Sequence, residues 1–359
     1  MRTLVVSDLH LGAARARDAL RRAPVLDALV ARVRDADRLV ILGDALELRH
    51  GPLRDAVAVA EPVFAALGAA LGADAELVLV PGNHDHALLA GWLEGRIVGG
   101  VAPAPLGLQG SPGPRASLAL AQLAAAAAPA RFDVAYPGLW LRPDVYAMHG
   151  HYLDRLITIP TFERLAAGAM GRVVGRLPAD GADPDDFEAA LAPLYAWMHA
   201  VAQTRRSRWA VERQSASAGA WQTLTRTGRR TPRARAAARL FPVAVAGINR
   251  AGLGPVRSEL SGVELRRAGL AAFAEVVRLL GIDAEHVVFG HTHRAGPLPG
   301  DDRSEWRAAT GARLHNAGCW IDEPIFATGG PESPYSGGRV LVLDDDGPPR
   351  LERVVDALA

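Results

Sequence analysis

Short runs of Val, Leu and Ile recur along the chain, and each leads within a residue or two into a polar or glycine-containing motif. The runs cover Thr3–Val6, Leu39–Leu42, Leu77–Val80, Val145–Met148 and Val287–Phe289. Continuous apolar runs of this length, bounded by Gly, Asp or Asn, are typical of strands that are buried on both faces. The pattern therefore predicts a core of strands with polar motifs at their ends.

Helical patterns separate the first three of these runs. Arg17–Val33 carries apolar residues at roughly helical spacing, and Leu53–Leu71 predicts a second helix. The alternation of strand and helix predicts an α/β fold with parallel strands and right-handed crossovers. Because ligands of such sheets gather at the carboxyl ends of the strands, we expect residues as far apart as Asp8 and His291 to form one site.

The pattern changes twice further along the chain. Residues 99–138 are rich in Gly, Pro and Ala, and we interpret them as an excursion with one helix at Arg115–Ala128. From residue 153 to residue 261 the strand signal is absent, and Asp183 followed by Pro184 marks a helix start. Helices are predicted in this stretch at Phe187–Val201, Arg205–Gly228 and Pro232–Val245. We therefore predict a core of residues 1–152 and 262–359, interrupted by a helical insertion of residues 153–261.

The end of the chain returns to the core pattern. Val263–Leu280 is an amphipathic helix, and Arg313–Ala317 and Arg339–Leu343 are strand-like runs. These elements are expected to complete the sheets.

Charge is distributed unevenly. Residues 199–257 contain twelve arginines and one acid, Glu212, which leaves 28 basic and 38 acidic residues elsewhere, a balance of −10. The arginine-rich stretch is interpreted first as an ordinary solvated helical cap, and as the alternative it predicts a basic face for an anionic partner, with a membrane surface or lipid favoured over a nucleic acid. The 49% of apolar residues predicts a packed core and excludes general disorder.

The chain offers little for disulfide or membrane-spanning functions. Cys319 is the single cysteine, and the apolar stretches at residues 117–129 and 240–248 are too short to cross a bilayer. The apolar opening leads directly into Asp8 without a signal-peptide pattern. We therefore expect a cytoplasmic protein, with any membrane contact peripheral.

Five motifs carry the chemistry, and all of them follow predicted strands. They are Ser7-Asp8-Leu9-His10, Gly43-Asp44, Gly82-Asn83-His84-Asp85, Met148-His149-Gly150 and Gly290-His291-Thr292-His293. Asp8 and His10 are two residues apart at a strand end, so both can reach the same ion. Asp44 has two carboxylate oxygens and can bridge metals that lie about 3.5–4 Å apart.

The remaining candidates, Asn83, His149, His291 and His293, add one amide oxygen and three imidazoles. Mixed oxygen and imidazole ligation favours two divalent transition-metal ions, Mn, Fe, Zn, Co or Ni, over Ca²⁺. The ligand set does not choose among these metals, and Mn is our first expectation.

These motifs resemble the calcineurin-like metallophosphoesterase superfamily, whose pattern is D-x-H, G-D, G-N-H-[D/E], H and G-H-x-H in this order. The resemblance covers residues 1–151 and 286–318. It implies a four-layer αββα sandwich of two mixed sheets flanked by helices, with the predicted core as the catalytic part. It also implies one metal held by Asp8, His10, Asp44 and His293, and a second held by Asp44, Asn83, His149 and His291.

The resemblance further implies a dinuclear phosphoester hydrolase in which a hydroxide between the metals attacks phosphorus. His84 would then assist the leaving group, and Asp85 would orient His84. The substrate class stays open among phosphomonoesters, diesters and pyrophosphate-linked lipids or nucleotides. A nuclease that uses the basic insertion and a non-catalytic scaffold of the same fold are the alternatives.

The details of the motifs look like the branch that contains UDP-diacylglucosamine pyrophosphohydrolases. Glu47 follows Asp44 by three residues, and Arg294 follows the last motif directly. The chain departs from that branch at His84, where arginine is typical, and at His149-Gly150-His151, where His-Gly-Asp is typical. His151 and Arg294 are candidate substrate contacts.

Overall fold

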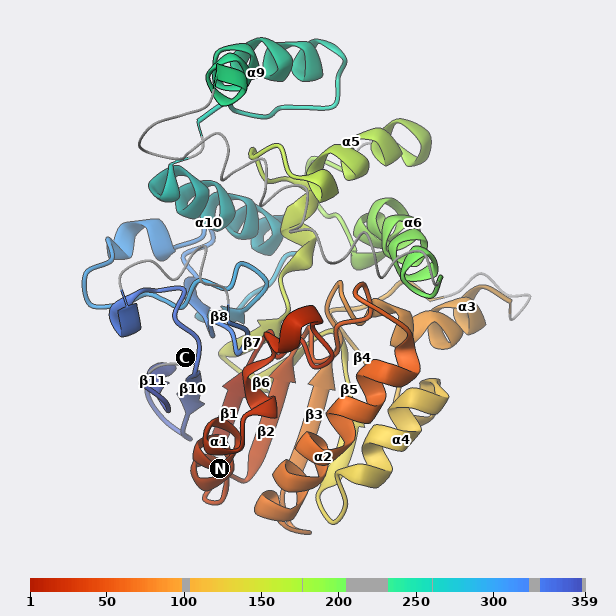
Figure 1. Cartoon of the computed structure of the whole chain (residues 1–359), viewed down its shortest axis with the longest axis vertical. Coiled ribbons are helices and arrows are strands. Elements are labelled where there is room, and N and C mark those ends of the chain that lie inside the picture. Colours follow the sequence, from red (N-terminus) through yellow and green to blue (C-terminus); the bar gives the residue numbers. More distant parts are fainter. Residues whose placement is uncertain (99–103, 176, 205–231, 260, 323–329, 357–359) are drawn as a thin grey trace.

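The computed structural model describes the chain apart from residues 99–103, 176, 205–231, 260, 323–329 and 357–359 (Figure 1). Two mixed sheets form its centre. The first sheet has the order β11-β10-β1-β2-β3-β5, and the second has the order β4-β6-β7-β8-β9. Strands β1, β2, β3 and β5 run parallel, as do β7, β8 and β9, while the other pairings are antiparallel. The first sheet consists of β1 (Thr3–Val6), β2 (Arg38–Leu42), β3 (Glu76–Val80), β5 (Arg131–Val134), β10 (Arg339–Leu343) and β11 (Arg350–Arg353). The second consists of β4 (Gln109–Gly110), β6 (Tyr136–Arg142), β7 (Val145–Met148), β8 (His286–Phe289) and β9 (Arg313–Asn316).

Helices cover the outer faces of both sheets. The described helices are α1 (Ala23–Val33), α2 (Leu53–Leu71), α3 (Ala90–Val98), α4 (Leu118–Ala126), α5 (Phe162–Val174), α6 (Pro184–Ala202), α9 (Pro232–Arg250) and α10 (Gly262–Leu279). Of these, α1, α2 and α4 pack on the first sheet and α10 packs on the second. Short 3-10 helices include η3 (His86–Leu89) and η5 (His151–Arg155). Helices α5, α6 and α9 gather at one end of the molecule, and the N terminus lies toward the other (Figure 1).

The buried side chains divide into layers that follow the alternation along each strand. Leu4 and Val6 of β1 pack with α1, α2 and α4, whereas Val5 points the other way, into the core between the two sheets. In the second sheet Val287 faces the α10 side, and Val288 faces the inter-sheet core. The predicted four-layer αββα sandwich is confirmed, and both faces of the strands are buried, which explains their continuous apolar runs.

The expected elements agree well with the structure, with two corrections. The strands at the five runs and the helix over Leu53–Leu71 are confirmed. The predicted helix over Arg17–Val33 begins later, at Ala23, because Asp18 accepts a hydrogen bond from the Gly12 amide and holds the preceding segment in short turns. The interpretation of residues 99–138 as an excursion is wrong, because β4, β5 and the start of β6 lie there and extend both sheets.

The predicted helical insertion carries α5, α6 and α9, and no strand occurs in the part of 153–261 that the structure describes. Asp183 caps α6 as predicted, by accepting from the Asp186 amide. The predicted helix Arg205–Gly228 lies outside the described residues. The contact of this arginine-rich stretch with a membrane surface or nucleic acid, and the domain boundaries, stay predictions.

A buried carboxylate fastens α6 to the rest of the protein. Glu188 accepts hydrogen bonds from Tyr152 Oη, at 2.7 Å, and from Tyr136 Oη. It also pairs with His86 Nε2 at 2.9 Å. These partners lie on η5, β6 and η3, so one side chain joins α6 to three other elements. Among the described residues, no helix is both long and apolar enough to cross a membrane.

Candidate metal centre

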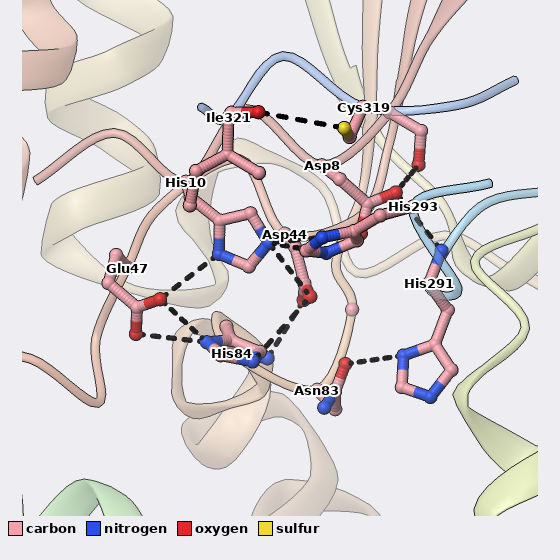
Figure 2. A network of polar contacts seen from close by, with 12 residues as sticks. Asp8, His10, Asp44, Glu47, Asn83, His84, His291, His293, Cys319 and Ile321 are labelled. Atoms are coloured by element: carbon pink, nitrogen blue, oxygen red, sulfur yellow. Dashed lines mark hydrogen bonds and ion pairs between the residues drawn. The ribbon is translucent and has the colours of Figure 1, made fainter. Parts of the chain in front are cut away.

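The candidate ligands lie in the loops that follow the strands, where the two sheets come together. Asp8 follows β1, Asp44 follows β2 and Asn83 follows β3, all in the first sheet, while His149 and His291 follow β7 and β8 of the second. The backbone amide of His291 donates to Asp8 Oδ2 at 3.0 Å, although the two residues are 283 positions apart. The structure thus brings together the residues that the sequence selects (Figure 2).

The backbone at these positions is unusual. Five candidate ligands other than glycine have φ in the left-handed region, namely Asp8 (57°), His10 (47°), Asp44 (51°), His291 (64°) and His293 (56°). Asp and His are among the few residue types that adopt this region with moderate cost, and such strain clusters at functional sites.

Two motif glycines allow the ligands to approach each other. A Cβ on Gly43 would lie 2.1 Å from His149 Nδ1, and a Cβ on Gly290 would lie 1.9 Å from Ser7 Oγ. Glycine is therefore required at both positions to let the loops of the two sheets meet.

Asp8, His10 and His293 form one group, which we name the Asp8 half-site. His293 Nε2 lies 3.2 Å from Asp8 Oδ1 and 3.1 Å from His10 Nε2. Asp8 Oδ2 accepts from Ser7 Oγ and from the His291 amide, whereas the buried Oδ1 has no hydrogen-bond donor. That oxygen and the two imidazoles face a common point (Figure 2).

Asn83, His149 and His291 form the second group, the Asn83 half-site. Asn83 Oδ1 lies 3.2 Å from both His149 Nε2 and His291 Nδ1. Asp44 Oδ2 lies 3.3 Å from His149 Nε2 and 3.7 Å from His10 Nε2, so this carboxylate reaches both half-sites.

The hydrogen bonds on the outer side of each ring show which nitrogen carries the proton. His149 Nδ1 lies 2.9 Å from the Leu42 carbonyl oxygen, His10 Nδ1 lies 3.0 Å from Glu47 Oε2, and His291 Nε2 lies 3.1 Å from Asp154 Oδ1. Carbonyl and carboxylate oxygens only accept, so these nitrogens donate and the inner nitrogens present lone pairs. When these rings are neutral, lone pairs and carboxylate oxygens face one another, an arrangement that protons or bound cations stabilise.

The Asn83 side-chain amide can present either its nitrogen or its oxygen to the site. Rotated by half a turn, its nitrogen would donate to His291 Nδ1, His149 Nε2 and Asp44 Oδ2, each at 3.2 Å. That orientation satisfies the site by hydrogen bonds alone, whereas the oxygen-inward orientation supplies a fourth ligand atom to a metal ion.

The electrostatics of the site also favour bound positive charge. Burial opposes ionisation of Asp8 and Asp44, but the surrounding imidazoles outweigh it and hold the pKa of both carboxyls below its usual value. Burial likewise opposes protonation of His10 and His149, but the carboxylates raise the pKa of His10 to about 10 and that of His149 to about 9. Protons or metal ions can meet this demand for positive charge, and the donor set suits metal ions.

Glu47 holds two rings of the site. Its carboxylate lies 3.0 Å from His10 Nδ1 and 2.8 Å from His84 Nδ1, and the side chain is almost fully buried. Burial and then the charge of Arg49 lower the pKa of His84 to about 4, which keeps this ring neutral.

Asp85 differs from its expected role. Its carboxylate accepts from the amides of Gly82 at 2.6 Å and Ala45 at 2.7 Å, and so it ties the Gly43-Asp44 loop to the Gly82-Asn83 loop. Glu47, rather than Asp85, holds His84, because the first turn after Asn83 directs the Asp85 side chain toward the neighbouring loop.

The two candidate substrate contacts also lie differently from what we expected. His151 is fully buried behind His149, where its Nε2 lies 3.3 Å from Tyr136 Oη, and it does not line the cavity. Arg294 lines the cavity, but Asp301 binds its guanidinium at 2.5 Å and 3.0 Å. Both side chains are thus engaged with protein groups.

A cavity of about 330 Å³ opens beside the two half-sites. Asp44, Asn83, His84, His291 and His293 line it. The rest of its lining combines charged residues, among them Glu163, Arg266 and Arg294, with the apolar residues Leu153, Ile157, Leu265, Leu270, Phe289 and Trp306.

Sequence reasoning missed Arg49 and Asp154 and noted Glu47 without a role. Arg49 Nη1 lies 3.3 Å from His84 Nε2, and Asp154 holds His291 as described above. The spacing of Glu47 from Asp44 was a usable signal, whereas single charged residues such as Arg49 and Asp154 have no periodicity that would distinguish them.

Comparison with known proteins bears on this site. A sequence model described as calcineurin-like phosphoesterase matches residues 1–201, which is more than half of the 359 residues. The chain belongs to the calcineurin-like phosphoesterase family. The family match includes the Asp8, Asp44, Asn83 and His149 motifs and continues through α5 into α6.

Solved structures give weaker likenesses. A cold-active protein-tyrosine phosphatase of Shewanella sp. is 14% identical, with a TM-score of 0.30, over 96% of this chain and 75% of that one. A dimetal phosphatase from Danio rerio is 12% identical, with a TM-score of 0.36, over 96% of this chain and 93% of that one. At these values neither likeness bears on the activity of this calcineurin-like phosphoesterase. A search of curated proteins finds no match to the chain.

Proposed function

We propose that this member of the calcineurin-like phosphoesterase family is a hydrolase of phosphoesters that depends on two divalent metal ions. The observation that carries the proposal is the convergence of inward lone pairs in two half-sites that share Asp44. Asp8 Oδ1, which accepts no hydrogen bond, and the facing imidazoles of His10 and His293 form a donor set that a divalent cation would satisfy. Mn is our first expectation for the metals.

The residues divide into two ligand sets. Asp8, His10 and His293 would hold one ion, Asn83, His149 and His291 the other, and Asp44 would hold both. Two such ions lower the pKa of a water molecule and stabilise the charge on the phosphoryl oxygens.

His84 has the position of a group that contacts the leaving oxygen. It lines the cavity, and its Nε2 lies 3.9 Å from Asp44 Oδ2. Glu47 fixes the ring through Nδ1. We propose that His84 stabilises the leaving oxygen and that the ester group of the substrate lies against the apolar residues that line the cavity.

The experiment begins with protein stripped by a chelator and reloaded separately with Mn, Fe, Zn, Co or Ni. Hydrolysis of p-nitrophenyl phosphate and of bis-p-nitrophenyl phosphate is measured, and bound metal is counted. We expect about two ions per chain and metal-dependent turnover of at least one substrate. Uptake of only trace metal, or inactivity with all five metals, would refute the proposal.

The variant His84→Ala tests whether His84 acts on the leaving group or binds a metal ion. Turnover should fall by about 10² or more, as is usual when a group that assists proton transfer or charge on the leaving atom is lost. Metal content should stay near that of the wild type. Unchanged turnover would remove His84 from the mechanism.

A further inference from the structure

Arg49 connects the helices α5 and α6, which we call the helical segment, to the candidate active site. It lies in the loop after Asp44, and its side chain is only 8% exposed. On one side its Nη1 lies 3.3 Å from His84 Nε2, and its Nη2 donates to the Asn83 carbonyl oxygen at 3.1 Å.

On its other side Arg49 contacts two helices of the segment that follows β7. Its Nη1 lies 3.4 Å from Glu163 Oε1 on α5, and its guanidinium lies over the Tyr195 ring on α6, 5.4 Å from the centroid. Arg49 is therefore in contact with both α5 and α6 and with Asn83 and His84 of the third motif.

The guanidinium is not fixed by a close carboxylate pair. Arg294 and Arg266, which line the cavity, pair with Asp301 at 2.5 Å and with Glu305 at 2.6 Å. Arg49 makes only the longer contact with Glu163, and its buried Nε has no hydrogen-bond partner. Its position thus depends on both groups of neighbours rather than on one strong ion pair.

His84 is held from opposite sides of its ring. Glu47 accepts from Nδ1, so Nε2 carries the lone pair and accepts from Arg49. Rotation about the outer torsion of a histidine side chain is soft, and one hydrogen bond leaves the ring free to tilt. The second contact, from Arg49, removes that freedom.

We infer that Arg49 is a positioning residue through which α5 and α6 set the orientation of His84. The inference rests on the proposed function, because it assigns His84 to the leaving group. It gives the helical segment a direct part in turnover, in addition to forming walls of the cavity.

The decisive experiment varies the leaving group. A series of aryl phosphates with leaving phenols of increasing pKa is hydrolysed by the wild type, Arg49→Ala, His84→Ala and the double variant, each loaded with Mn. Arg49→Ala should lower kcat by about 10-fold with KM changed less than about twofold, as expected when an interaction made only in the transition state is lost. The loss should grow as the leaving phenol becomes less acidic.

The double variant tests whether the two residues act together. If Arg49 works through His84, the double variant should be no slower than His84→Ala, because residues that act as a unit are not additive. Additive losses, or a leaving-group dependence in Arg49→Ala equal to that of the wild type, would overturn the inference.

A matched control is available in Arg96. It also joins the core to α6, through Asp185 at 2.9 Å, and it also lies over an aromatic ring, that of Trp92 at 5.8 Å. Arg96→Gln should leave the leaving-group dependence unchanged.

Glu163→Gln removes the anchor of Arg49 and should give a smaller loss of kcat, about 2- to 5-fold, with the same dependence on the leaving group as Arg49→Ala. It also carries the test if Arg49→Ala does not fold.

A readout without metal separates this inference from the proposed function. In metal-free protein, the ring ¹⁵N signals of His84, assigned by their loss in His84→Ala, should show a proton on Nδ1. They should shift in Arg49→Ala and stay in place in Arg96→Gln. Unchanged signals in Arg49→Ala would overturn the inference, whereas an inactive wild type with normal His84 signals would instead refute the proposed function.

Discussion

The two half-sites are built from similar candidate ligands but are held in place by different parts of the chain. In the Asp8 half-site, His10 is oriented by Glu47, which comes from the same loop as Asp44 and also holds His84. In the Asn83 half-site, His149 is oriented by a backbone carbonyl of β2, and His291 by Asp154 on η5, where the helical segment begins. The first half-site thus shares its support, Glu47, with His84, whereas the second is supported by β2 and η5.

A change at Asp44 should affect both half-sites at once, because both share this carboxylate. Asp44→Asn removes one of the two oxygens able to ligate and half of the negative charge that draws two cations together. We expect kcat/KM to fall by about 10³-fold or more, which reflects lost electrostatic stabilisation of the transition state. Metal analysis should show fewer than two ions per chain. Retention of both ions with normal kcat/KM would contradict the shared role.

Glu47→Gln and Asp154→Asn form a pair that sharpens the contrast. Loss of a group that orients a metal-bound histidine costs about 10- to 100-fold in metal affinity or activity. Both variants should weaken metal binding within that range, measured by titration with Mn²⁺. Only Glu47→Gln should also steepen the dependence of rate on the leaving group, because Glu47, unlike Asp154, contacts His84. Equal dependence in both variants would show that the half-sites are not coupled differently.

Metal removal tests whether each half-site also joins the two sheets. Asp8 and His10 come from the first sheet and His293 from the second, and Asn83 meets His149 and His291 in the same way. Metal at about 100 times its Kd should stabilise the fold by about 2.7 kcal/mol per site. Urea unfolding with Mn²⁺ and with chelator should show this difference. His10→Ala and His149→Ala should each lose part of it, and an unchanged midpoint with chelator would refute the link.

The smallest predicted effect concerns the second sheet alone. His286 Nδ1 lies 2.9 Å from His315 Nε2, and burial, followed by the charge of His286, lowers the pKa of His315 to about 3. The folded pKa lies below the unfolded value of 6.5. The unfolded state therefore binds the proton first, and stability is lost as the pH falls below about 6.5, by about 1.4 kcal/mol per pH unit.

This loss can be measured by urea unfolding of metal-free protein between pH 7.5 and pH 5. His315→Gln should flatten the pH dependence, since glutamine does not titrate. A slope equal to that of the wild type would show that other groups cause the loss.

The sequence predicted the elements whose patterns reflect burial. Strands such as β2 and β8 are buried on both faces, so their apolar runs were visible, and the ligands were visible because each follows such a strand. The strand β5 has the sequence Arg-Phe-Asp-Val at the edge of its sheet and offers no continuous apolar run. It was therefore missed.

The supporting residues of the site were harder to predict. Asp85 and Glu47 are both acids near His84, and only the course of the loops decides that Glu47 reaches the ring while Asp85 binds backbone amides. Arg49 and Asp154 act through contacts with residues far away in the chain, which no local pattern records. His151 and Arg294 stood next to motifs, but packing against Tyr136 and Asp301 engages them elsewhere.

The left-handed backbone at five ligand positions restricts how this centre can change. Asparagine or glycine could replace Asp8, Asp44 or the histidines at 10, 291 and 293 without distorting the loops, but would abolish or weaken ligation. Threonine and valine, branched at Cβ, would clash with the backbone whatever their affinity for a metal. Attempts to convert the centre to another coordination chemistry are thus limited first by backbone conformation, and only then by the preference of the ion.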